Sequence, residues 1–337
     1  MIRVAIDAMG GDHAPAAPVA GTALALAEDA ADFHVQLVGQ AAAIEAELVK
    51  QHIVDRSRIE LVDAPEVIGM GEKPLQAVRS KRRSSIAVGL GLQKQGRSDA
   101  FISAGNTGAV MAASTLVLKL YPGFERPAIG TPFPTVRKDM PVLVLDAGAN
   151  VDCAAEELVG FAHLGQIYAR DAWGRADPVV ALLNIGEEEE KGNAAVKEAH
   201  RLLAASGLKF IGNVEGRDLV TARCDRGAFD VVVCDGFVGN VLLKFYESIR
   251  HLIRGLAERE VGAEFMQSDS VRRVFKGLDY AVYGGAPLLG VIGVSIISHG
   301  SSSPAAFRSA IRVAVEAARH HYIQHMNTEF AAGSVPS

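Results

Sequence analysis

Short apolar runs recur along the chain at intervals that suit buried strands. Most are rich in Val, Ile and Leu, as expected of strands that are covered on both faces of a sheet. They predict strands at Val4–Ile6, His34–Val38, Ile59–Val62, Ala100–Ser103, Val142–Leu145, Val179–Asn184, Phe210–Gly212, Val231–Cys234 and Val291–Ile297.

Segments with apolar residues at helical spacing separate these runs. They predict helices over Ala16–Ala30, Ala41–His52, Leu75–Gln95, Thr107–Leu120, Ala154–Ala172, Ala194–Ala205, Val241–Glu258 and Pro304–Asn327. Alternating strands and helices favour a mostly parallel sheet with helices on both sides. The sequence therefore predicts an α/β protein, a three-layer α/β/α sandwich, with one domain over residues 1–330 and a frayed tail at 331–337.

Glycines and small polar residues follow the predicted strands, at the end where parallel sheets bind ligands. Seven such loops lie at 7–12, 103–108, 146–150, 184–193, 212–218, 235–240 and 298–303. Glycine lets the backbone approach a ligand, and Asn, Asp or Ser caps the next helix, whose free N–H groups attract an anion. Each loop alone is also what an ordinary strand-to-helix turn needs. The seven together predict a polar pocket suited to phosphate.

Several functional classes are disfavoured by composition and by motifs that the sequence lacks. No GxGxxG, GxxxxGKS, GxxxxGKT, GxSxG or HExxH occurs, and the formal net charge of −5 argues against a nucleic-acid partner. The three cysteines show no CxxC spacing, which predicts a reducing cytoplasm and no metal site. The start of the chain does not resemble a signal peptide, and the uncharged stretch Tyr280–Ser298 contains four glycines and a proline, which suit a loop and a strand rather than a membrane span.

A series of short stretches from Ile2 to Ile311 is specific as an ordered set. The stretches are DAMGGDHAP, KPLQAVRSKRRSS, SAGNTGA, ERPAIGTPFPT, DAGANVD, NIGEEEEKGN, FIGNVEGRD, DVVVCDGFVGN, YGGAPLLGV and HGSSS followed by AFRSAI. In these stretches the chain resembles the bacterial phosphate acyltransferases of phospholipid synthesis, the PlsX family.

The resemblance implies a fold related to phosphotransacetylases and isocitrate-dehydrogenase-like enzymes, and a homodimer. It also implies a reaction in which inorganic phosphate attacks the thioester of a long-chain acyl carrier protein. The acyl phosphate would then pass to a membrane acyltransferase, and no cofactor is implied. Two alternatives stay open: a coenzyme-A-dependent phosphotransacylase of short acyl chains, and a non-catalytic scaffold for the carrier protein.

Phosphate is itself the nucleophile in this reaction, so the protein must supply positioning and electrostatic stabilisation. We expect the catalytic residues to be Lys191, Asn106, Asn240 and His299. Lys191 would hold phosphate, the asparagines would donate to phosphate or the oxyanion, and His299 would protonate the leaving thiolate. The alternatives are a solvated lysine that balances Glu187–Glu190, helix caps and a structural histidine.

The glycine loops supply the expected phosphate-binding residues. These are Gly10, Gly11, Asp12, Ser103, Gly105, Thr107, Asn150, Asn213, Asp218, Asp235 and Gly239. Asp7, Asp12, Asp146 and Asp235 end or follow strands, where they are expected to anchor the loops rather than to act as a base.

Two further segments predict contacts with other molecules. The basic cluster Arg79, Lys81, Arg82 and Arg83, on a predicted helix, suits an acidic carrier protein, or else it is a solvated face. The segment 241–279 carries apolar residues at helical spacing, which suits core packing or a dimer contact. The resemblance implies that the segment projects and makes peripheral contact with a membrane.

Overall fold

The structure is a computed structural model that describes residues 1–337 except 29–32, 138–139, 267, 278–282, 320–321 and 331–337. The described chain forms two compact units. Unit 1 comprises residues 1–127, 171–174 and those described from 283 onward, and unit 2 comprises 128–170 and those described within 175–282. The single domain over 1–330 stays a prediction, and the expected tail lies outside the described residues.

Unit 1 is built on a mostly parallel run of strands. Their order is β3 (Ile59–Asp63), β2 (Phe33–Gly39), β1 (Ile2–Asp7), β4 (Ala100–Ser103), β13 (Ser295–Ile297) and β12 (Ala286–Leu289). Neighbours are parallel except β12 and β13, which are antiparallel. Because β1, β4 and β13 are adjacent and parallel, their carboxyl ends meet at one edge of the sheet.

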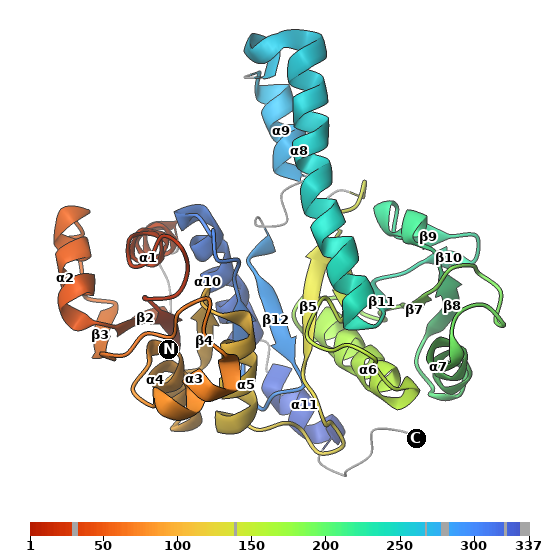
Figure 1. The fold of residues 1–337 in the computed structure, drawn as a ribbon, viewed down its shortest axis with the longest axis horizontal. Helices are drawn as coiled ribbons and strands as arrows, with labels where there is room; N and C mark the ends of the chain where they lie inside the picture. The colour runs from red at the N-terminus through yellow and green to blue at the C-terminus, as the bar shows by residue number, and fades with distance from the viewer. Residues whose placement is uncertain (29–32, 138–139, 267, 278–282, 320–321, 331–337) are drawn as a thin grey trace. The chain divides into compact units, whose positions relative to one another are not determined.

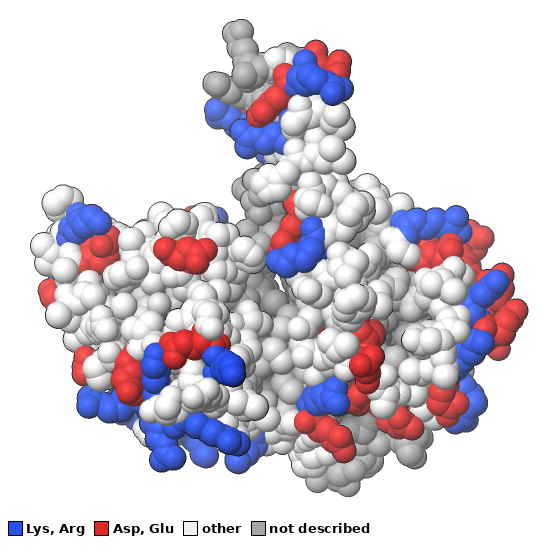
Figure 2. Space-filling view, in the orientation of Figure 1, with Lys and Arg blue, Asp and Glu red and all other residues white. Residues whose placement is uncertain are grey.

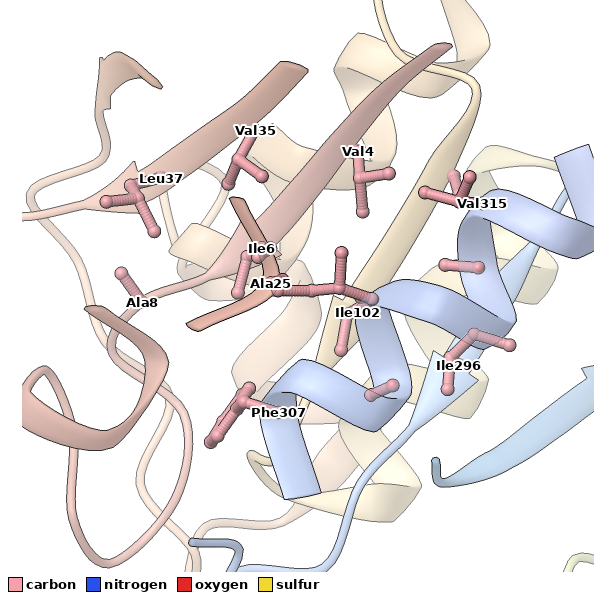
Figure 3. Packing of buried hydrophobic residues seen from close by; sticks show 14 of the residues in the cluster. Val4, Ile6, Ala8, Ala25, Val35, Leu37, Ile102, Ile296, Phe307 and Val315 are labelled. Atoms are coloured by element: carbon pink, nitrogen blue, oxygen red, sulfur yellow. The ribbon is translucent and has the colours of Figure 1, made fainter. Parts of the chain in front are cut away.

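Helices cover both faces of this sheet (Figure 1). On one face α1 (Ala16–Glu28) packs with α10 (Pro304–Arg319), and Figure 3 shows Val4, Ile6 and Ile102 in the core between them and the strands. On the other face lies α4 (Ser85–Lys94), where Gly89 admits the ring of Phe101: a Cβ there would lie 2.4 Å from Cε2. Period-two alternation thus sends neighbouring strand residues to opposite helix layers. The remaining helices of unit 1 are α2 (Ala41–Lys50), α3 (Pro74–Ser80), α5 (Thr107–Val117) and α11 (Tyr322–Phe330).

Unit 2 has the same kind of layering. The strands follow the order β5 (Ala128–Phe133), β6 (Val142–Leu145), β11 (Val231–Val233), β7 (Val180–Leu183) and β8 (Phe210–Val214), and only β5 runs antiparallel to its neighbour. The helix α6 (Ala155–Asp171) packs closely on β11 at Gly165, where a Cβ would lie 2.6 Å from Val231 Cγ1. The helix α7 (Ala194–Ala205) lies against β8, and a short ribbon of η1 (Gly216–Val220), β9 (Arg223–Cys224) and β10 (Gly227–Ala228) follows.

The helix α8 (Gly236–Met266) starts on the core of unit 2 and then leaves it. Leu242, Leu243 and Tyr246 pack against the core, whereas Leu252 and Leu256, further along, are exposed. The chain bends at Gly262 (φ 80°), and α9 (Asp269–Gly277) lies beside α8, so that both extend away from the strands (Figure 1). Within the described ranges, no helix has the length and apolar character needed to cross a bilayer.

The mostly parallel α/β architecture is confirmed, and so are most of the predicted elements. The single helix expected over Leu75–Gln95 is wrong: α3 ends at Ser80 and α4 begins at Ser85, because the Ser84 side chain accepts from Ala87 N–H and caps a new helix. The strand expected from Val291 begins only at Ser295. The strands β5 and β12 were not predicted, because Pro132 and Pro287 interrupt their apolar runs and proline is unusual within a strand.

Candidate active site

A buried carboxylate, Asp7, organises the carboxyl ends of β1 and β4 in unit 1. Its Oδ2 accepts from Ser103 Oγ at 2.7 Å and its Oδ1 from Met9 N–H at 3.1 Å. Ser103 Oγ in turn accepts from Gly105 N–H at 3.0 Å. Burial raises the pKa of the Asp7 carboxyl, while donors that include the Ser85 hydroxyl oppose the rise. These contacts give Asp7 the anchoring role that its position predicted.

The glycines of this edge bring the loops into contact with one another. A Cβ on Gly10 would lie 2.5 Å from Asp7 Oδ2 and 2.7 Å from Gly105 N. Gly11 has φ +98°, and a Cβ there would lie 2.9 Å from Gly300 O, which also accepts from Asp12 N–H at 2.8 Å. The loops after β1, β4 and β13 therefore form one closely packed assembly. Glycine is needed in it for the close approach of one loop to another, as well as for any contact with a ligand.

Asn106 caps α5 and ties down a neighbouring loop. Its Oδ1 accepts from Ala109 N–H at 3.0 Å, and its Nδ2 donates to Met70 O at 2.9 Å and Glu72 O at 3.1 Å. Both amide hydrogens are thus engaged with backbone carbonyls. The exposed Thr107 follows at the first position of α5, where the helical N–H groups have no partner within the helix.

His299 lies exposed in the loop after β13. Its Nδ1 is 2.7 Å from Ser301 Oγ and accepts from Ser301 N–H at 3.2 Å. The next residue, Gly300, borders the exposed Asp12: a Cβ on Gly300 would lie 3.6 Å from Asp12 Oδ2. Unit 1 therefore gathers Gly10, Gly11, Asp12, Ser103, Gly105, Asn106, Thr107 and His299 around three adjacent strand ends.

A second buried carboxylate, Asp146, plays the corresponding part in unit 2. Its Oδ1 accepts from the N–H groups of Ile129 (3.0 Å), Gly148 (3.2 Å) and Ala149 (3.0 Å). Its Oδ2 accepts from Asn150 N–H at 2.7 Å and from Asn150 Nδ2 at 2.9 Å. Burial raises the pKa of the Asp146 carboxyl and these donors oppose the rise. The loop after β6 thus curves around the Asp146 carboxylate, and the side-chain amide of Asn150 donates to this carboxylate.

The first turn of α8 packs against the same loop. Asp235 caps the helix by accepting from Phe237 N–H at 2.8 Å, and it also accepts from Cys153 N–H at 2.8 Å. Gly239 is buried, and a Cβ there would lie only 1.9 Å from Asp146 O. Asn240 follows on the exposed side, and a Cβ on Gly148 would lie 3.2 Å from its Oδ1. Asn240 makes no hydrogen bond with its side chain among the described residues.

Two buried cysteines border this anchor. Burial raises the pKa of the Cys153 thiol to about 12, and it raises the pKa of the Cys234 thiol well above its usual value. Both thiols therefore stay protonated at neutral pH. Neither cysteine therefore supplies the thiolate that a nucleophile requires.

Lys191 lies in a turn that its own backbone closes. Lys191 N–H donates to Glu188 O at 3.2 Å, and Lys191 O accepts from Asn184 Nδ2 at 3.0 Å. The side chain is 45% exposed, with Nζ 3.8 Å from Glu188 Oε1. Such an exposed pair contributes little stability, so the ammonium group is available to an anion. Asn213, fully buried on β8, donates from Nδ2 to Glu188 O at 2.8 Å.

Three carboxylates cluster beside this turn, from Glu187, Glu215 and Asp218. Asp218 Oδ2 accepts from Glu215 N–H at 2.9 Å and closes a capping box at η1. Glu215 pairs with Arg217, and Glu187 Oε2 lies 3.1 Å from Arg226 Nη1. Asp218 Oδ1 also lies 4.0 Å from Arg217 Nε, so each of the three carboxylates has an arginine partner and the cluster carries no metal assignment.

The basic residues expected to dock a carrier protein lie at the junction of α3 and α4. Arg79, Arg82 and Arg83 are exposed, and Figure 2 shows basic side chains gathered over this part of unit 1. Lys81 differs, because its Nζ donates to Glu72 Oε1 at 2.5 Å and to Val67 O at 2.8 Å. The cluster does not lie on one continuous helix as expected, because α3 ends before Lys81.

The seven predicted loops fall into two groups, three in unit 1 and four in unit 2. The anchors Asp7 and Asp146 were expected from their positions after strands. Their partners were not: Ser85 for Asp7, Ile129 for Asp146, and His200 and Arg226 around Asn213. The sequence carried no signal for these pairs, since most of the partners lie far from each other along the chain.

Comparison with known proteins adds evidence that the geometry alone does not give. A family model described as a fatty acid synthesis protein matches residues 2–325. The chain belongs to this family. Proteins named phosphate acyltransferase from Nostoc punctiforme and Heliobacterium modesticaldum are 46% and 48% identical to it, over 98% and 96% of this chain and 96% of each relative. The resemblance drawn from the sequence stretches is confirmed.

Solved structures of low sequence identity share the fold. A phosphotransacetylase from Streptococcus pyogenes aligns with a TM-score of 0.64 and the EutD phosphotransacetylase from Staphylococcus aureus with 0.62. Each is 16% identical and the alignment covers 94% of both chains. The expected relation to the phosphotransacetylase fold is therefore confirmed, and at this identity the likeness concerns the fold alone.

The contact between α8 and the Asp146 loop predicts the effect of one added methyl group. Gly239→Ala places a Cβ against backbone atoms of Asp146 and Ala147 that cannot turn aside, and it should cost about 3 kcal/mol of stability. Gly255→Ala is the matched control, because a Cβ on Gly255, in the same helix, meets nothing within 4 Å. It should gain about 0.5–1 kcal/mol. Urea denaturation measures both, and equal stabilities of the two variants would contradict the packing described.

Proposed function

We propose that this chain transfers a long-chain acyl group from the thioester of acyl carrier protein to inorganic phosphate, and so makes acyl phosphate for phosphatidic acid synthesis. The observation that carries the proposal is the 44–48% identity to relatives named phosphate acyltransferase, over 94% or more of this chain. The anchored loops support it, because they concentrate N–H groups, amides and a lysine at strand ends, as an anionic substrate requires.

The reaction needs no nucleophile from the protein. A phosphate oxygen attacks the thioester carbonyl carbon, and the carbonyl electron pair moves to oxygen. The oxyanion then collapses, the carbon–sulfur bond breaks and the thiolate takes up a proton. The products are acyl phosphate and free carrier protein. The protein must hold a dianion, stabilise the oxyanion and supply one proton.

We assign these tasks to the predicted residues according to their contacts. Lys191 supplies a positive charge to phosphate, and Asn240, with no side-chain partner in the described ranges, supplies amide donors to phosphate or the oxyanion. Asn106 acts indirectly, because its Nδ2 is already hydrogen-bonded to the Met70 carbonyl. Its Oδ1 caps α5 and so orients the free N–H groups in the first turn of that helix. His299 is the proposed proton donor to the leaving thiolate.

The role of Lys191 predicts a large loss of turnover on its removal. Lys191→Ala should lower the rate of acyl phosphate formation about 100-fold, the usual effect of losing one stabilising donor. Lys197→Ala is the control, since Lys197 is an exposed lysine on the neighbouring helix α7 and should leave the rate unchanged. The assay follows acyl phosphate with purified protein, acyl carrier protein and phosphate. Equal rates for the two variants would contradict the assignment, and no product from the unaltered chain would contradict the function itself.

A second candidate function is a coenzyme-A-dependent phosphotransacylase of short acyl chains. Anion-suited loops fit this candidate as well, because phosphate receives the acyl group in both reactions. The two candidates differ in the donor, so a higher kcat/KM with short-chain acyl-CoA than with long-chain acyl carrier protein would select the second.

We further propose that Arg79, Arg82 and Arg83 receive the acidic surface of the carrier protein. All three are exposed, and along the chain they flank Lys81, which binds Glu72 of the loop at 69–72 that Asn106 fixes next to α5. Lys81 does not face the carrier protein in this proposal. It holds the junction of α3 and α4 against the preceding loop, through its bonds to Glu72 and Val67. Opposite charges across such a surface mainly raise the rate of association.

Charge reversal tests the docking surface. Arg82→Glu together with Arg83→Glu should raise KM for acyl carrier protein about tenfold at low salt, with a difference that shrinks as salt screens the charges. Lys50→Glu with Lys94→Glu changes the net charge equally at exposed positions on α2 and α4, and should change KM little. If both double variants raised KM alike, a specific docking surface would be excluded.

The exposed apolar side chains of α8 and α9 support two further parts of the proposal, a homodimer and peripheral contact with a membrane. Phe245, Leu252 and Leu256 on α8 and Val274 on α9 are all exposed, and Arg272 and Arg273 are exposed on α9. A partner helix would cover the apolar residues, and an anionic bilayer would also attract the basic ones. Sedimentation measures the homodimer, and co-flotation with anionic vesicles measures the membrane contact. The three free cysteines support placing the enzyme in a reducing cytoplasm.

A further inference from the structure

Around Lys191, a chain of hydrogen bonds leads away from the loop into the interior of unit 2. It starts at Glu188 O, which accepts from Lys191 N–H at 3.2 Å and from Asn213 Nδ2 at 2.8 Å. It continues from Asn213 Oδ1 to His200 Nδ1 at 2.9 Å. Both Asn213 and His200 are buried, on β8 and α7. The backbone of the predicted catalytic lysine is thus tied, through Glu188 O, to two buried side chains on β8 and α7.

The donors and acceptors in this chain are fixed by its two ends. Asn213 must present its NH₂ group to the carbonyl of Glu188, so its oxygen faces the histidine. His200 therefore carries its proton on Nδ1 and donates it to Asn213 Oδ1. An asparagine with the reversed orientation would set its oxygen against the Glu188 carbonyl. The Glu188 carbonyl and the His200 donor therefore stabilise the same orientation of Asn213, one from each end of its amide.

The surroundings hold His200 in place. Its ring meets Phe210 edge-on, with ring centroids 5.2 Å apart, and its Nε2 lies 3.9 Å from Glu189 Oε1. Asn213 is held from its other side by Arg226, whose guanidinium donates to Asn213 O and to Ile211 O. Arg226 also pairs with Glu187 at the start of the turn. The turn is therefore attached to β8 at two points, through Asn213 and through Arg226.

We propose that His200 is a positioning residue for the phosphate-binding turn: by fixing the orientation of Asn213, it fixes the backbone of Glu188–Lys191 and so the position from which Lys191 reaches phosphate. The consequence for catalysis rests on the proposed role of Lys191. The structural consequence does not, because it concerns only whether the turn stays closed.

Hydrogen exchange of the turn tests the structural part without any turnover. His200→Phe keeps an aromatic ring on Phe210 but removes the donor. Exchange of the peptide that contains Lys191 N–H should then become about five- to tenfold faster, the size of one net hydrogen bond. His200→Asn places an amide N–H where Nδ1 stood and should restore the exchange rate to within about twofold. His251→Phe, at an exposed histidine on α8, is the control and should change nothing.

The kinetic readout distinguishes positioning from general damage. His200→Phe should raise KM for inorganic phosphate about five- to tenfold and leave KM for acyl carrier protein unchanged, and His200→Asn should reverse the rise. Asn213→Asp is the second variant in case His200→Phe does not fold. It keeps an acceptor for His200 but removes the donor to Glu188, so it should open the turn in the same way.

The proposal would be overturned if the turn exchanged hydrogen at the wild-type rate in a folded His200→Phe or Asn213→Asp variant. It would also be overturned if His200→Asn raised the exchange rate and KM for phosphate as much as His200→Phe does. If the turn opened as expected while the unaltered chain made no acyl phosphate, the proposed function would fail and the positioning role would stand.

Discussion

Hydrogen bonding to a buried carboxylate at a strand end is the constraint on which the two units depend. Asp7 in unit 1 and Asp146 in unit 2 each collect N–H or O–H donors from their own loop and from a distant segment. Each carboxylate would be costly to bury alone, and the converging donors offset that cost. The donors, in turn, are held in loops that would otherwise have many conformations.

This arrangement explains why glycine is concentrated in these loops. The backbone winds so tightly around each anchor that a Cβ on Gly10 or Gly239 would collide with the anchor residue itself. Glycine is therefore required by the packing of loop against loop, before any ligand is considered. The same close packing fixes the backbone at the start of each following helix. The N–H groups there are therefore preorganised, as a reaction of phosphate requires.

Much of the fold could be predicted from the sequence because it follows from local pattern. Buried parallel strands are short apolar runs, and the loop that follows each one has a recognisable composition, so the positions of Asp7 and Asp146 could be assigned to strand ends. The break between α3 and α4 could not be predicted from helical spacing, because the cap at Ser84 competes with an uninterrupted apolar pattern. The strands β5 and β12 were missed because prolines interrupt them.

The candidate site was predictable in its residue types but not in their partners. Asn106, Asn150 and Asn213 were expected to donate to phosphate, whereas their amides serve a loop carbonyl, a carboxylate and the Glu188 carbonyl. Nothing in one sequence distinguishes an amide that faces a ligand from one that faces the backbone, because both lie at or just after the end of a strand. Asn240 and Lys191 differ in this respect, since their side chains remain exposed.

The central claim is that these loops serve phosphate as the attacking nucleophile. The most direct measurement incubates the purified chain with long-chain acyl carrier protein and phosphate labelled with ¹⁸O, and analyses the product by mass spectrometry. The account predicts acyl phosphate that retains all the label of the phosphate, formed in step with free carrier protein. Release of fatty acid without acyl phosphate, or no consumption of the thioester, would contradict it.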